Sequence, residues 1–215
     1  MRNVYGAALG EVFWAASDIG WVVGHSYIVY GPLVSGCATV LYEGKPVGTP
    51  DAGAFWRIVE AHRVSTLFTA PTAVRAMRRA DPEGEHIKAY DRSSLRHLFL
   101  AGERADAPTL NWIGEQLGIP VIDHWWQTEL GWPALATCIG LGDHAVKVGS
   151  AGKPVPGYSF KLVDANGEAA CNEGALLIER PLPPGCLTTL WRSDDRFRQT
   201  YLDQFPGHYI GLPPK

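Results

Sequence analysis

The 215-residue sequence lacks the features that mark several large classes of protein. Its four cysteines include no Cys-x-x-Cys pair, so their spacing predicts neither a zinc site nor a disulfide framework. Lysine and arginine form no cluster or stripe, which argues against nucleic acid as a partner. No apolar run approaches the roughly 18 residues of a membrane-spanning helix, and the first residues do not form a signal peptide pattern. Together these absences favour a reducing, cytoplasmic setting without a membrane partner.

Two common catalytic patterns are missing as well. The phosphate-binding loop GxxxxGK[ST] does not occur. His25 has no serine or second histidine near it in a triad arrangement, and a lone histidine is more often a satisfied core residue than a catalytic base. Serine-hydrolase chemistry is therefore not predicted. The composition, 46% hydrophobic and 19% charged, is instead that of a globular protein with a core.

The first two-thirds of the chain alternates between segments typical of strands and segments typical of helices. The expected strands are residues 11–15, 38–42, 65–69, 95–101 and 119–122. The expected helices follow Thr49, which would cap a helix with Pro50 at its first position, Pro71, and Asp106, a second capping residue. Strands separated by helices of this length predict a mainly parallel sheet with flanking helices, and we expect an α/β subdomain over residues 1–142.

The pattern changes after about residue 142. The remainder is rich in glycine and proline and has no helical periodicity before about Asp194. Residues 158–163 and 174–179 predict two strands around a turn at 164–167, because Asn166-Gly167 favours the positive φ angles of such turns. We expect residues 143–215 to form a smaller, incomplete β-rich subdomain.

Two polar clusters follow neighbouring predicted strands. One is Ala101-Gly102-Glu103-Arg104, and the other is DHWWQTELG at residues 123–131. Open parallel sheets bind ligands beyond the carboxyl ends of their strands. Carboxylates can hold a metal ion or ribose hydroxyls, and indole faces can wall a flat ligand. The clusters therefore predict a binding site, with an aromatic turn that merely caps the core as the alternative for residues 123–131.

Five segments together resemble the adenylate-forming acyl-CoA synthetases, in the branch of the acetyl- and propionyl-CoA synthetases. They are residues 12–33, 67–77, 98–106, 123–131 and 149–158, and the resemblance extends to about Tyr209. The pair Trp125-Trp126 and the sequence Gly-Glu-Arg at 102–104 are more similar to propionate–CoA ligases than to acetate–CoA ligases. The resemblance implies an ATP-dependent, AMP-forming reaction. A short-chain carboxylate attacks the α-phosphate of ATP to give an acyl-adenylate, and coenzyme A then displaces AMP.

The resemblance also implies roles for individual residues. The adenine pocket would be lined by Gly102, Glu103, Arg104, Asp123, His124 and Trp125. Gln127 and Thr128 would approach the phosphates, and Glu129 would bind Mg²⁺, so that Thr128 and Glu129 are the expected catalytic residues; the alternative for Glu129 is a cap or salt bridge in a surface turn. The acyl pocket would be walled by Trp21, Val22, Val23, Ala101 and Trp126. Composition alone favours an ordinary packed turn for residues 17–27. Propionate is favoured, with acetate, butyrate or another short acid as alternatives.

Several family features are not found in this sequence. The glycine-rich phosphate loop would precede Met1, a ribose-binding aspartate is missing near residues 209–213, and the C-terminal domain with its catalytic lysine is absent. Leu130 stands where the family usually has threonine. We therefore expect a fragment of a ligase that forms no acyl-CoA alone, or a catalytically dead remnant that acts as a nucleotide-binding or interaction module.

The expected fragment has two further implications. Sheet edges left open by missing strands invite pairing with another chain, so a homo-oligomer is a candidate assembly. A full-length parent would be cytoplasmic, with the mitochondrial matrix as an alternative.

Overall fold

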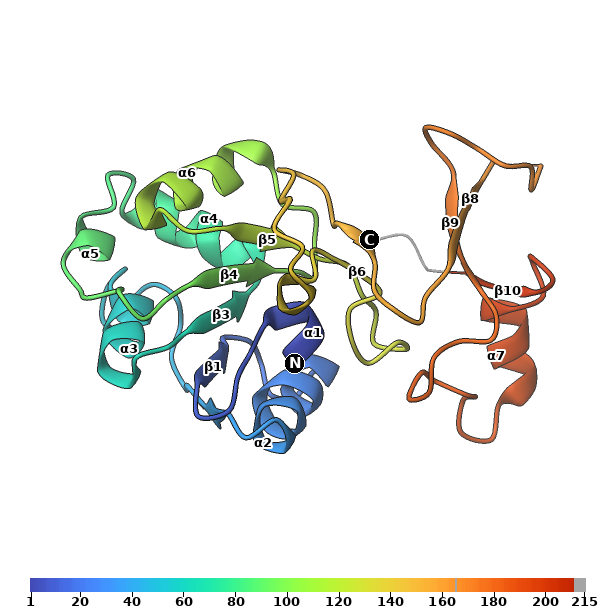
Figure 1. Ribbon diagram of the computed structural model, residues 1–215, viewed down its shortest axis with the longest axis horizontal. Helices are drawn as coiled ribbons and strands as arrows, with labels where there is room; N and C mark the ends of the chain where they lie inside the picture. The colour runs from blue at the N-terminus through green and yellow to red at the C-terminus, as the bar shows by residue number, and fades with distance from the viewer. Residues whose placement is uncertain (165, 211–215) are drawn as a thin grey trace. The chain divides into compact units, whose positions relative to one another are not determined.

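The computed structural model describes residues 1–164 and 166–210 (Figure 1). The chain folds into two compact units. The first unit comprises residues 1–125 and 135–153, and the second comprises residues 126–134 and 154–215. The chain thus leaves the first unit after Trp125 and returns to it at Leu135. The domain division expected at residue 142 stays a prediction.

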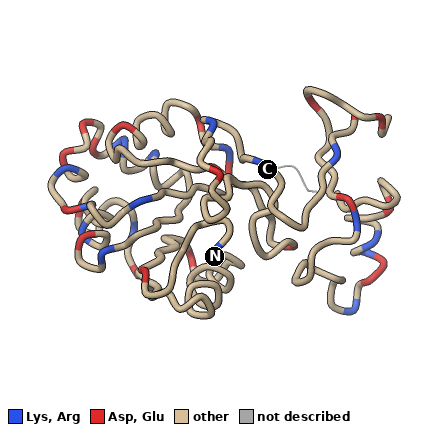
Figure 2. The backbone as a smooth tube through the Cα atoms, in the orientation of Figure 1, with Lys and Arg blue, Asp and Glu red and all other residues tan. Residues whose placement is uncertain are grey.

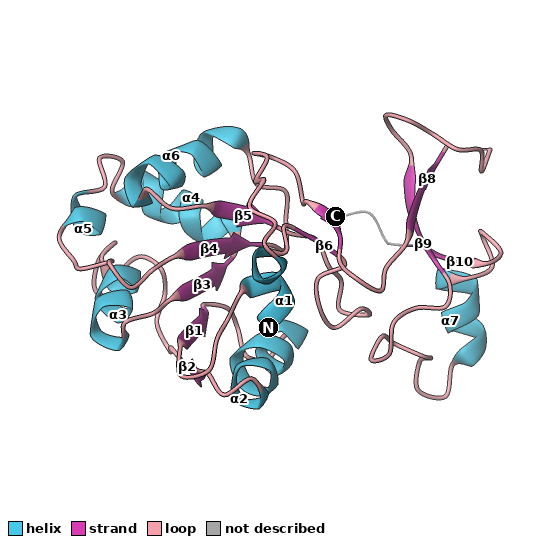
Figure 3. Cartoon of the chain, in the orientation of Figure 1, coloured by secondary structure: helices cyan, strands magenta, loops and turns pink. Residues whose placement is uncertain are grey.

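A five-stranded parallel sheet forms the centre of the first unit (Figures 1 and 3). Its order is β2-β1-β3-β4-β5, and every neighbouring pair in it is parallel. The strands are β1 (Val12–Ala15), β2 (Ala38–Thr39), β3 (Thr66–Thr69), β4 (His97–Leu100) and β5 (Val121–Asp123). The predicted mainly parallel sheet is therefore confirmed, although β2 ends three residues earlier than expected.

Helices precede and connect these strands. They are α1 (Arg2–Tyr5), a π-helix over Gly24–Tyr30, α2 (Gly31–Val34), α3 (Ala54–His62), α4 (Pro71–Ala80), α5 (Glu85–Lys88), α6 (Ala107–Leu117) and a short 3₁₀ turn over Ile139–Leu141. Pro71 occupies the first turn of α4, where its missing N–H costs no helical bond. The carboxylate of Asp106 accepts a hydrogen bond from the Thr109 N–H at 2.9 Å and caps α6 as predicted.

The prediction that a helix begins at Thr49 is wrong. The hydroxyl of Thr49 accepts a hydrogen bond from the Lys45 N–H at 3.0 Å, within the preceding loop. The carboxylate of Asp51 accepts one from the Gly53 N–H at 2.7 Å. These local side-chain bonds compete with a helical turn, and α3 accordingly begins only at Ala54.

The sheet buries aromatic residues on both of its faces. Neighbouring residues of a strand point to opposite faces. Phe13 packs against Tyr5 of α1, with ring centroids 5.1 Å apart, whereas Trp14 packs against Phe55 of α3 at 4.7 Å. The core on the Trp14 face also takes in buried residues of α4 and α6, among them Val74 and Ile113. The sheet is thus covered by α3, α4 and α6 on one face and by α1 and the π-helix on the other.

The second unit contains a small antiparallel sheet and one helix. Its strands are β8 (Phe160–Val163), β9 (Ala175–Glu179) and β10 (His208–Ile210), in the order β10-β9-β8, and its helix is α7 (Asp194–Tyr201). Gly167 adopts φ +82° in the predicted turn, and Asp164 accepts hydrogen bonds from the N–H groups of Asn166 and Glu168. Ala165 of that turn lies outside the described residues. The expected β-rich character of this region is confirmed.

A two-stranded sheet is formed by β6 (Leu135–Ala136) and β7 (Lys153–Pro154). Basic and acidic residues are interspersed in both units (Figure 2). Among the described residues, the structure contains no helix that combines the length and the apolar character needed to cross a membrane.

Candidate functional site at the carboxyl edge of the parallel sheet

The carboxyl ends of β1, β3, β4 and β5 lie at one edge of the sheet, since all of these strands are parallel. The loops that leave them begin side by side. The Ala101 N–H donates to the carbonyl of Thr69 at 3.3 Å, and the His124 N–H donates to the carbonyl of Leu100 at 3.0 Å. The two polar clusters that begin at Ala101 and Asp123 therefore follow strands that are hydrogen-bonded neighbours. This edge is the candidate site.

Gly102 is conformationally special within the first cluster. Its φ of +100° lies in a region that residues with a side chain rarely adopt. A methyl group built on its Cα meets no atom within 4 Å, so the position faces open space. Glycine here serves the backbone conformation and lets a ligand approach the chain closely.

Glu103 is tied to the start of α4. Its carboxylate accepts hydrogen bonds from the N–H and the hydroxyl of Thr72, the former at 2.7 Å, and lies 2.6 Å from the guanidinium of Arg75. Arg75 also reaches Asp106 at 3.3 Å. Burial works to raise the pKa of Glu103, but the bonds from Thr72 and Arg75 outweigh it and hold the pKa below its usual value. The side chain thus fixes the loop after β4, while the next residue, Arg104, is exposed.

Thr72 and Arg75 belong to the candidate site through their contacts with Glu103, and sequence reasoning did not single them out. Both lie in the segment 67–77 that carries part of the family resemblance. No local pattern pairs them with Glu103, because their contacts span 31 and 28 residues of sequence.

The second cluster begins with two residues whose pKa values are shifted by burial, Asp123 and His124. Asp123 ends β5, and partial burial raises the pKa of its carboxyl group to about 6 against the opposing effect of the His124 N–H. His124 is fully buried, and burial lowers the pKa of its imidazole to about 4. The neutral ring places Nδ1 2.7 Å from the carbonyl of Leu100 and Nε2 3.0 Å from the hydroxyl of Tyr5. Both ring nitrogens of His124 and its backbone N–H are therefore bonded within the first unit, so the side chain is not available to a ligand.

Trp125 continues from this pair into a short antiparallel bridge. Its N–H donates to the carbonyl of Leu135 at 2.9 Å, and the Leu135 N–H donates back at 3.1 Å. The indole is half-buried. The backbone of the loop is thus held at the point where the chain leaves the first unit.

The predicted acyl-pocket residues of the first unit differ in exposure. Trp21 is exposed, Val22 is half-buried, and Val23 and Ala101 are buried. A Cβ on Gly24 would lie 2.2 Å from the carbonyl oxygen of Ile19, so this close turn requires glycine. Trp21, Val22 and Val23 follow β1 and Ala101 follows β4, and β3 lies between these two strands in the sheet. A lone histidine is more often a core residue than a catalytic base, but the side chain of His25 is exposed.

A pocket of about 460 Å³ opens next to the carboxyl end of β1. The residues that line it include Ser17, Asp18, Tyr42, Lys45 and Phe55, together with Trp14. The indole Nε1 of Trp14 is buried and has no hydrogen-bond partner among the described residues. No local sequence pattern indicates this pocket, because its walls come from the segments 14–19 and 41–46 and from the helices α3 and α4.

The rest of the second cluster belongs to the second unit. Gln127 accepts hydrogen bonds at its carbonyl from the N–H groups of Leu130 and Gly131, at 3.0 and 3.3 Å, and closes a turn. Trp126 is half-buried and Thr128 is exposed. Leu130 is fully buried and anchors this turn.

Glu129 has a neutral hydrogen-bond partner. Its Oε1 accepts from the hydroxyl of Tyr201 at 2.6 Å, 72 residues later in the sequence. Burial, followed by the contact with this carboxylate, raises the pKa of Tyr201 to about 12, so the phenol remains a donor. Within the described part of the chain Glu129 forms no ion pair with a basic side chain, and the salt-bridge alternative for this residue therefore has no support.

The family model for AMP-binding enzymes matches residues 1–184, which is most of the chain. The chain belongs to this family. It is 56% identical over 211 residues to an uncharacterized protein of Pseudomonas aeruginosa, covering 97% of this chain and 34% of that protein. It is 52% identical over 212 residues to the mitochondrial acyl-CoA synthetase short-chain family member 3 of Mus musculus (97% and 31%). It is 50% identical over 208 residues to the propionate–CoA ligase of Escherichia coli K12 (95% and 33%). The chain thus spans about a third of the length of these relatives.

The resemblance stated from the sequence implies that Glu129 binds a magnesium ion. The described residues contain no group of three or more His, Cys, Asp or Glu side chains that could enclose a metal. Mg²⁺ is usually held through one or two carboxylates, substrate phosphates and several waters, not by an all-protein cage. The single carboxylate of Glu129, with Oε2 outside the Tyr201 bond, fits that kind of site.

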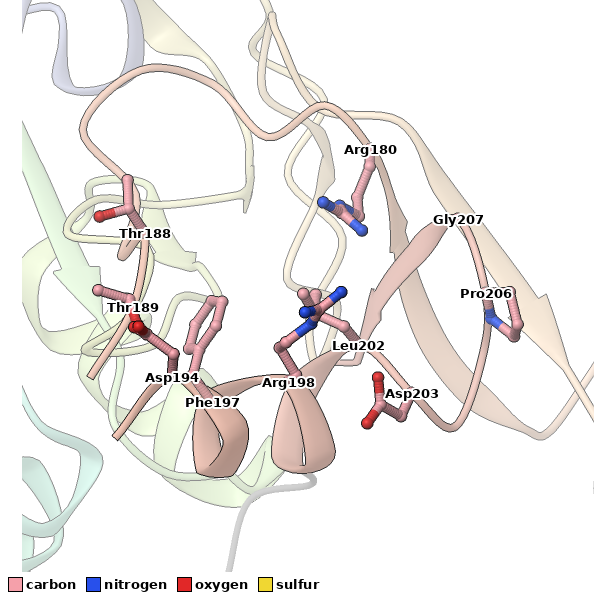
Figure 4. Close-up of a pocket in the computed structure, with 10 residues that line it drawn as sticks. All are labelled: Arg180, Thr188, Thr189, Asp194, Phe197, Arg198, Leu202, Asp203, Pro206 and Gly207. Carbon is pink, nitrogen blue, oxygen red and sulfur yellow. The ribbon is translucent and has the colours of Figure 1, made fainter. Parts of the chain in front are cut away.

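A larger pocket, of about 850 Å³, lies in the second unit of the chain (Figure 4). It is formed by α7 and by the segments before and after it, and the guanidinium groups of Arg180 and Arg198 point into it. None of the residues predicted from the sequence lines it. Its walls are mostly exposed side chains, so its volume alone does not make it the functional site.

Proposed function

We propose that the chain provides part of the nucleotide and acyl sites of an AMP-forming short-chain acyl-CoA ligase that activates propionate. The observation that carries the proposal is the placement of the two polar clusters. They follow β4 and β5, which are neighbours in a parallel sheet, and this is where open parallel sheets bind ligands. The names of two relatives, a propionate–CoA ligase and a short-chain acyl-CoA synthetase, support the reaction class.

The nucleotide would lie along this edge. The open backbone at Gly102 admits a flat base, and the loop around it is held by the bonds of Glu103 to α4. Arg104, the carboxyl of Asp123, the backbone of His124 and the indole of Trp125 complete the proposed adenine pocket. The buried imidazole of His124 keeps the second loop fixed to the core, so that the pocket is formed before the ligand arrives.

The phosphates would meet the loop that follows. Gln127 and the exposed hydroxyl of Thr128 supply hydrogen-bond donors, and Glu129 supplies the carboxylate for Mg²⁺. When bound, Mg²⁺ offsets the charge that develops on the α-phosphate. The substrate carboxylate oxygen attacks the α-phosphorus as the bond to pyrophosphate breaks, giving an acyl-adenylate. The thiolate of coenzyme A then attacks the acyl carbonyl, and AMP leaves.

The acyl group would be enclosed by Trp21, Val22, Val23, Ala101 and Trp126. Ala101 is small and buried, and the related acetate enzymes commonly have valine at this place. The freed volume suits one additional methylene, which favours propionate over acetate. A rigid indole at Trp126 excludes long chains, so fatty acids are not proposed as substrates.

The proposal extends to organisation and setting. Residues 1–142 would belong to the α/β part of the adenylation domain and residues 143–215 to its β-rich part. The protein would act in the cytoplasm, with the mitochondrial matrix as the alternative; the name of one relative describes that relative as mitochondrial. Pairing of copies through open sheet edges would give a homo-oligomer.

ATP–pyrophosphate exchange tests the function. A full-length chimera, in which the flanking segments come from a related propionate–CoA ligase, is assayed with propionate, acetate and no acid. Propionate-dependent exchange above the no-acid level is expected. The 215-residue chain is assayed in parallel for exchange and for ATP binding. Binding by this chain with no exchange by the chimera would identify a nucleotide-binding module and overturn the proposed ligase.

A further inference from the structure

The carboxylate of Glu129 is held in place by its surroundings in the second unit. Its Oε1 accepts the hydrogen bond of the Tyr201 hydroxyl at 2.6 Å. Its backbone carbonyl accepts a second bond, from the Leu187 N–H, at 2.7 Å. The next residue, Leu130, is completely buried. Both the backbone and one oxygen of the side chain are thus fixed before any ligand binds.

Tyr201 is itself well anchored. It is the last residue of α7, is 7% exposed, and stacks on Tyr209 with ring centroids 5.1 Å apart and an interplanar angle of 5°. Tyr209 is completely buried in β10. Phe197, one turn earlier in α7, also packs against Tyr201, with ring centroids 5.4 Å apart. The phenol therefore has little freedom to rotate away from Glu129.

We propose that Tyr201 is a positioning residue for Glu129: it occupies Oε1 and thereby directs Oε2 to a magnesium ion that carries the nucleotide phosphates. The inference rests on the proposed function, which assigns Glu129 to magnesium. It goes beyond that assignment because it adds to the loop at residues 126–131 a residue of α7, which lies outside the five segments that carry the family resemblance.

The chemistry of the partner supports this role. A lysine or arginine at this distance would compete with the cation for the charge of the carboxylate. A neutral phenol orients one oxygen and leaves the negative charge available, which is how hydrogen bonds beyond the first ligand shell tune metal-binding carboxylates. Glu129 makes no ion pair with a basic side chain in the part of the chain that the structure describes.

The chain offers a matched pair of variants for the test. Tyr201→Phe removes only the hydroxyl that reaches Glu129. Tyr209→Phe removes a hydroxyl from the other ring of the same stack, and this hydroxyl has no hydrogen-bond partner among the described residues. Both substitutions keep the stacked rings. ATP affinity of the 215-residue chain is measured by calorimetric titration with and without Mg²⁺, for the wild type, both variants, Glu129→Gln and the double variant of Tyr201 and Glu129.

Tyr201→Phe is expected to reduce the Mg²⁺-dependent gain in ATP affinity by about tenfold, the usual loss when such a supporting partner is removed. Its ATP affinity without Mg²⁺ is expected to stay at the wild-type value, and Tyr209→Phe should match the wild type in both conditions. Glu129→Gln should lose most of the gain, and adding Tyr201→Phe to it should cause no further loss.

The outcomes distinguish a failure of the inference about Tyr201 from a failure of the proposed function. A full Mg²⁺-dependent gain in Glu129→Gln contradicts the magnesium assignment of the proposed function. A loss in Glu129→Gln with wild-type behaviour in Tyr201→Phe overturns the inference alone. Equal losses with and without Mg²⁺ in Tyr201→Phe also overturn it, because they indicate a structural role only.

A second measurement uses only the wild-type protein and therefore does not depend on whether a variant folds. Mg²⁺ added in the presence of ATP is expected to shift the ultraviolet absorption of tyrosine, since it binds the carboxylate that accepts the Tyr201 hydroxyl. An unchanged tyrosine spectrum at saturating Mg²⁺ and ATP would contradict the inference.

Discussion

The hydroxyl of Tyr5 lies 3.0 Å from Nε2 of His124 and joins two residues 119 positions apart in the chain. Nδ1 of the same ring lies 2.7 Å from the carbonyl of Leu100. Since burial keeps the imidazole neutral, Nδ1–H donates to Leu100 and Nε2 accepts from Tyr5. This arrangement ties α1 to the loop after β5. A histidine expected at the nucleotide pocket thus acts through its side chain as a support for the loop.

Tyr5→Phe should lower the free energy of unfolding by about 1–3 kcal/mol, because it leaves the buried Nε2 of His124 without a donor. Tyr30→Phe is the control, since the side chain of Tyr30 is exposed. Chemical denaturation followed by tryptophan fluorescence measures both variants. Equal midpoints for Tyr5→Phe and the wild type would show that the bond contributes nothing to stability.

The pH dependence of stability should reveal opposing contributions from Asp123 and His124. Burial lowers the pKa of His124 from 6.5 to about 4, so its contribution to stability is complete above pH 6.5 and is lost as the pH falls toward 4. Burial raises the pKa of Asp123 from 3.8 to about 6. The contribution of Asp123 is therefore present at low pH and is lost as the pH rises through 6.

Asp123→Asn should remove the opposing contribution and leave that of His124. The variant should then lose stability more steeply than the wild type between pH 6.5 and 4, by at most about 1.4 kcal/mol per pH unit. Denaturation midpoints at half-unit pH intervals measure this slope. Asp203→Asn, at an exposed position, serves as the control. Parallel curves for Asp123→Asn and the wild type would contradict the prediction.

Two glycine substitutions should have opposite effects. Gly102→Ala places a side chain at φ +100°, which costs about 1–3 kcal/mol of strain, and fills the open space beside the backbone. Gly114→Ala lies within α6, where a Cβ would be 3.7 Å from Val121, and should stabilise the helix by about 0.5–1 kcal/mol. Nucleotide titration should show weakened binding for Gly102→Ala alone. Unchanged affinity in both variants would remove Gly102 from the proposed pocket.

Local chemistry explains which parts of the fold could be predicted from the sequence. Alternating strand and helix patterns predicted the parallel sheet, and the Asp106 cap and Pro71 predicted the starts of two helices, because each signal acts within a few residues. The same reasoning was wrong at Thr49, since the sequence does not show that its hydroxyl bonds to Lys45 in the preceding loop.

Less of the candidate site could be predicted from the sequence, because the residues that hold its side chains in place are distant in the chain. The two clusters could be placed by the strands they follow. The partners of Glu103, His124 and Glu129 could not, because the bonds from Thr72, Tyr5 and Tyr201 span 31, 119 and 72 residues. Such contacts depend on the register of the whole sheet and on the packing of helices, neither of which a local pattern contains.

Chain-length preference should depend on the volume beside Ala101. Ala101 is buried at the start of the loop after β4, at the candidate site. Valine at this position would add two methyl groups. One methylene in an apolar pocket changes selectivity by about 10–200-fold. In the full-length chimera, Ala101→Val should therefore shift the ratio of kcat/KM values from propionate toward acetate by about tenfold or more.

The matched control for this substitution is Ala145→Val, at an exposed position where the same two methyl groups should leave the ratio unchanged. Trp126→Gly should admit longer acids, because it removes the indole proposed to close the pocket. Both variants are compared with the wild type in acyl-CoA formation with acetate, propionate and butyrate. If Ala101→Val and Trp126→Gly keep the wild-type preference, these residues do not line the acyl pocket, and the propionate assignment loses its structural basis while the nucleotide site is unaffected.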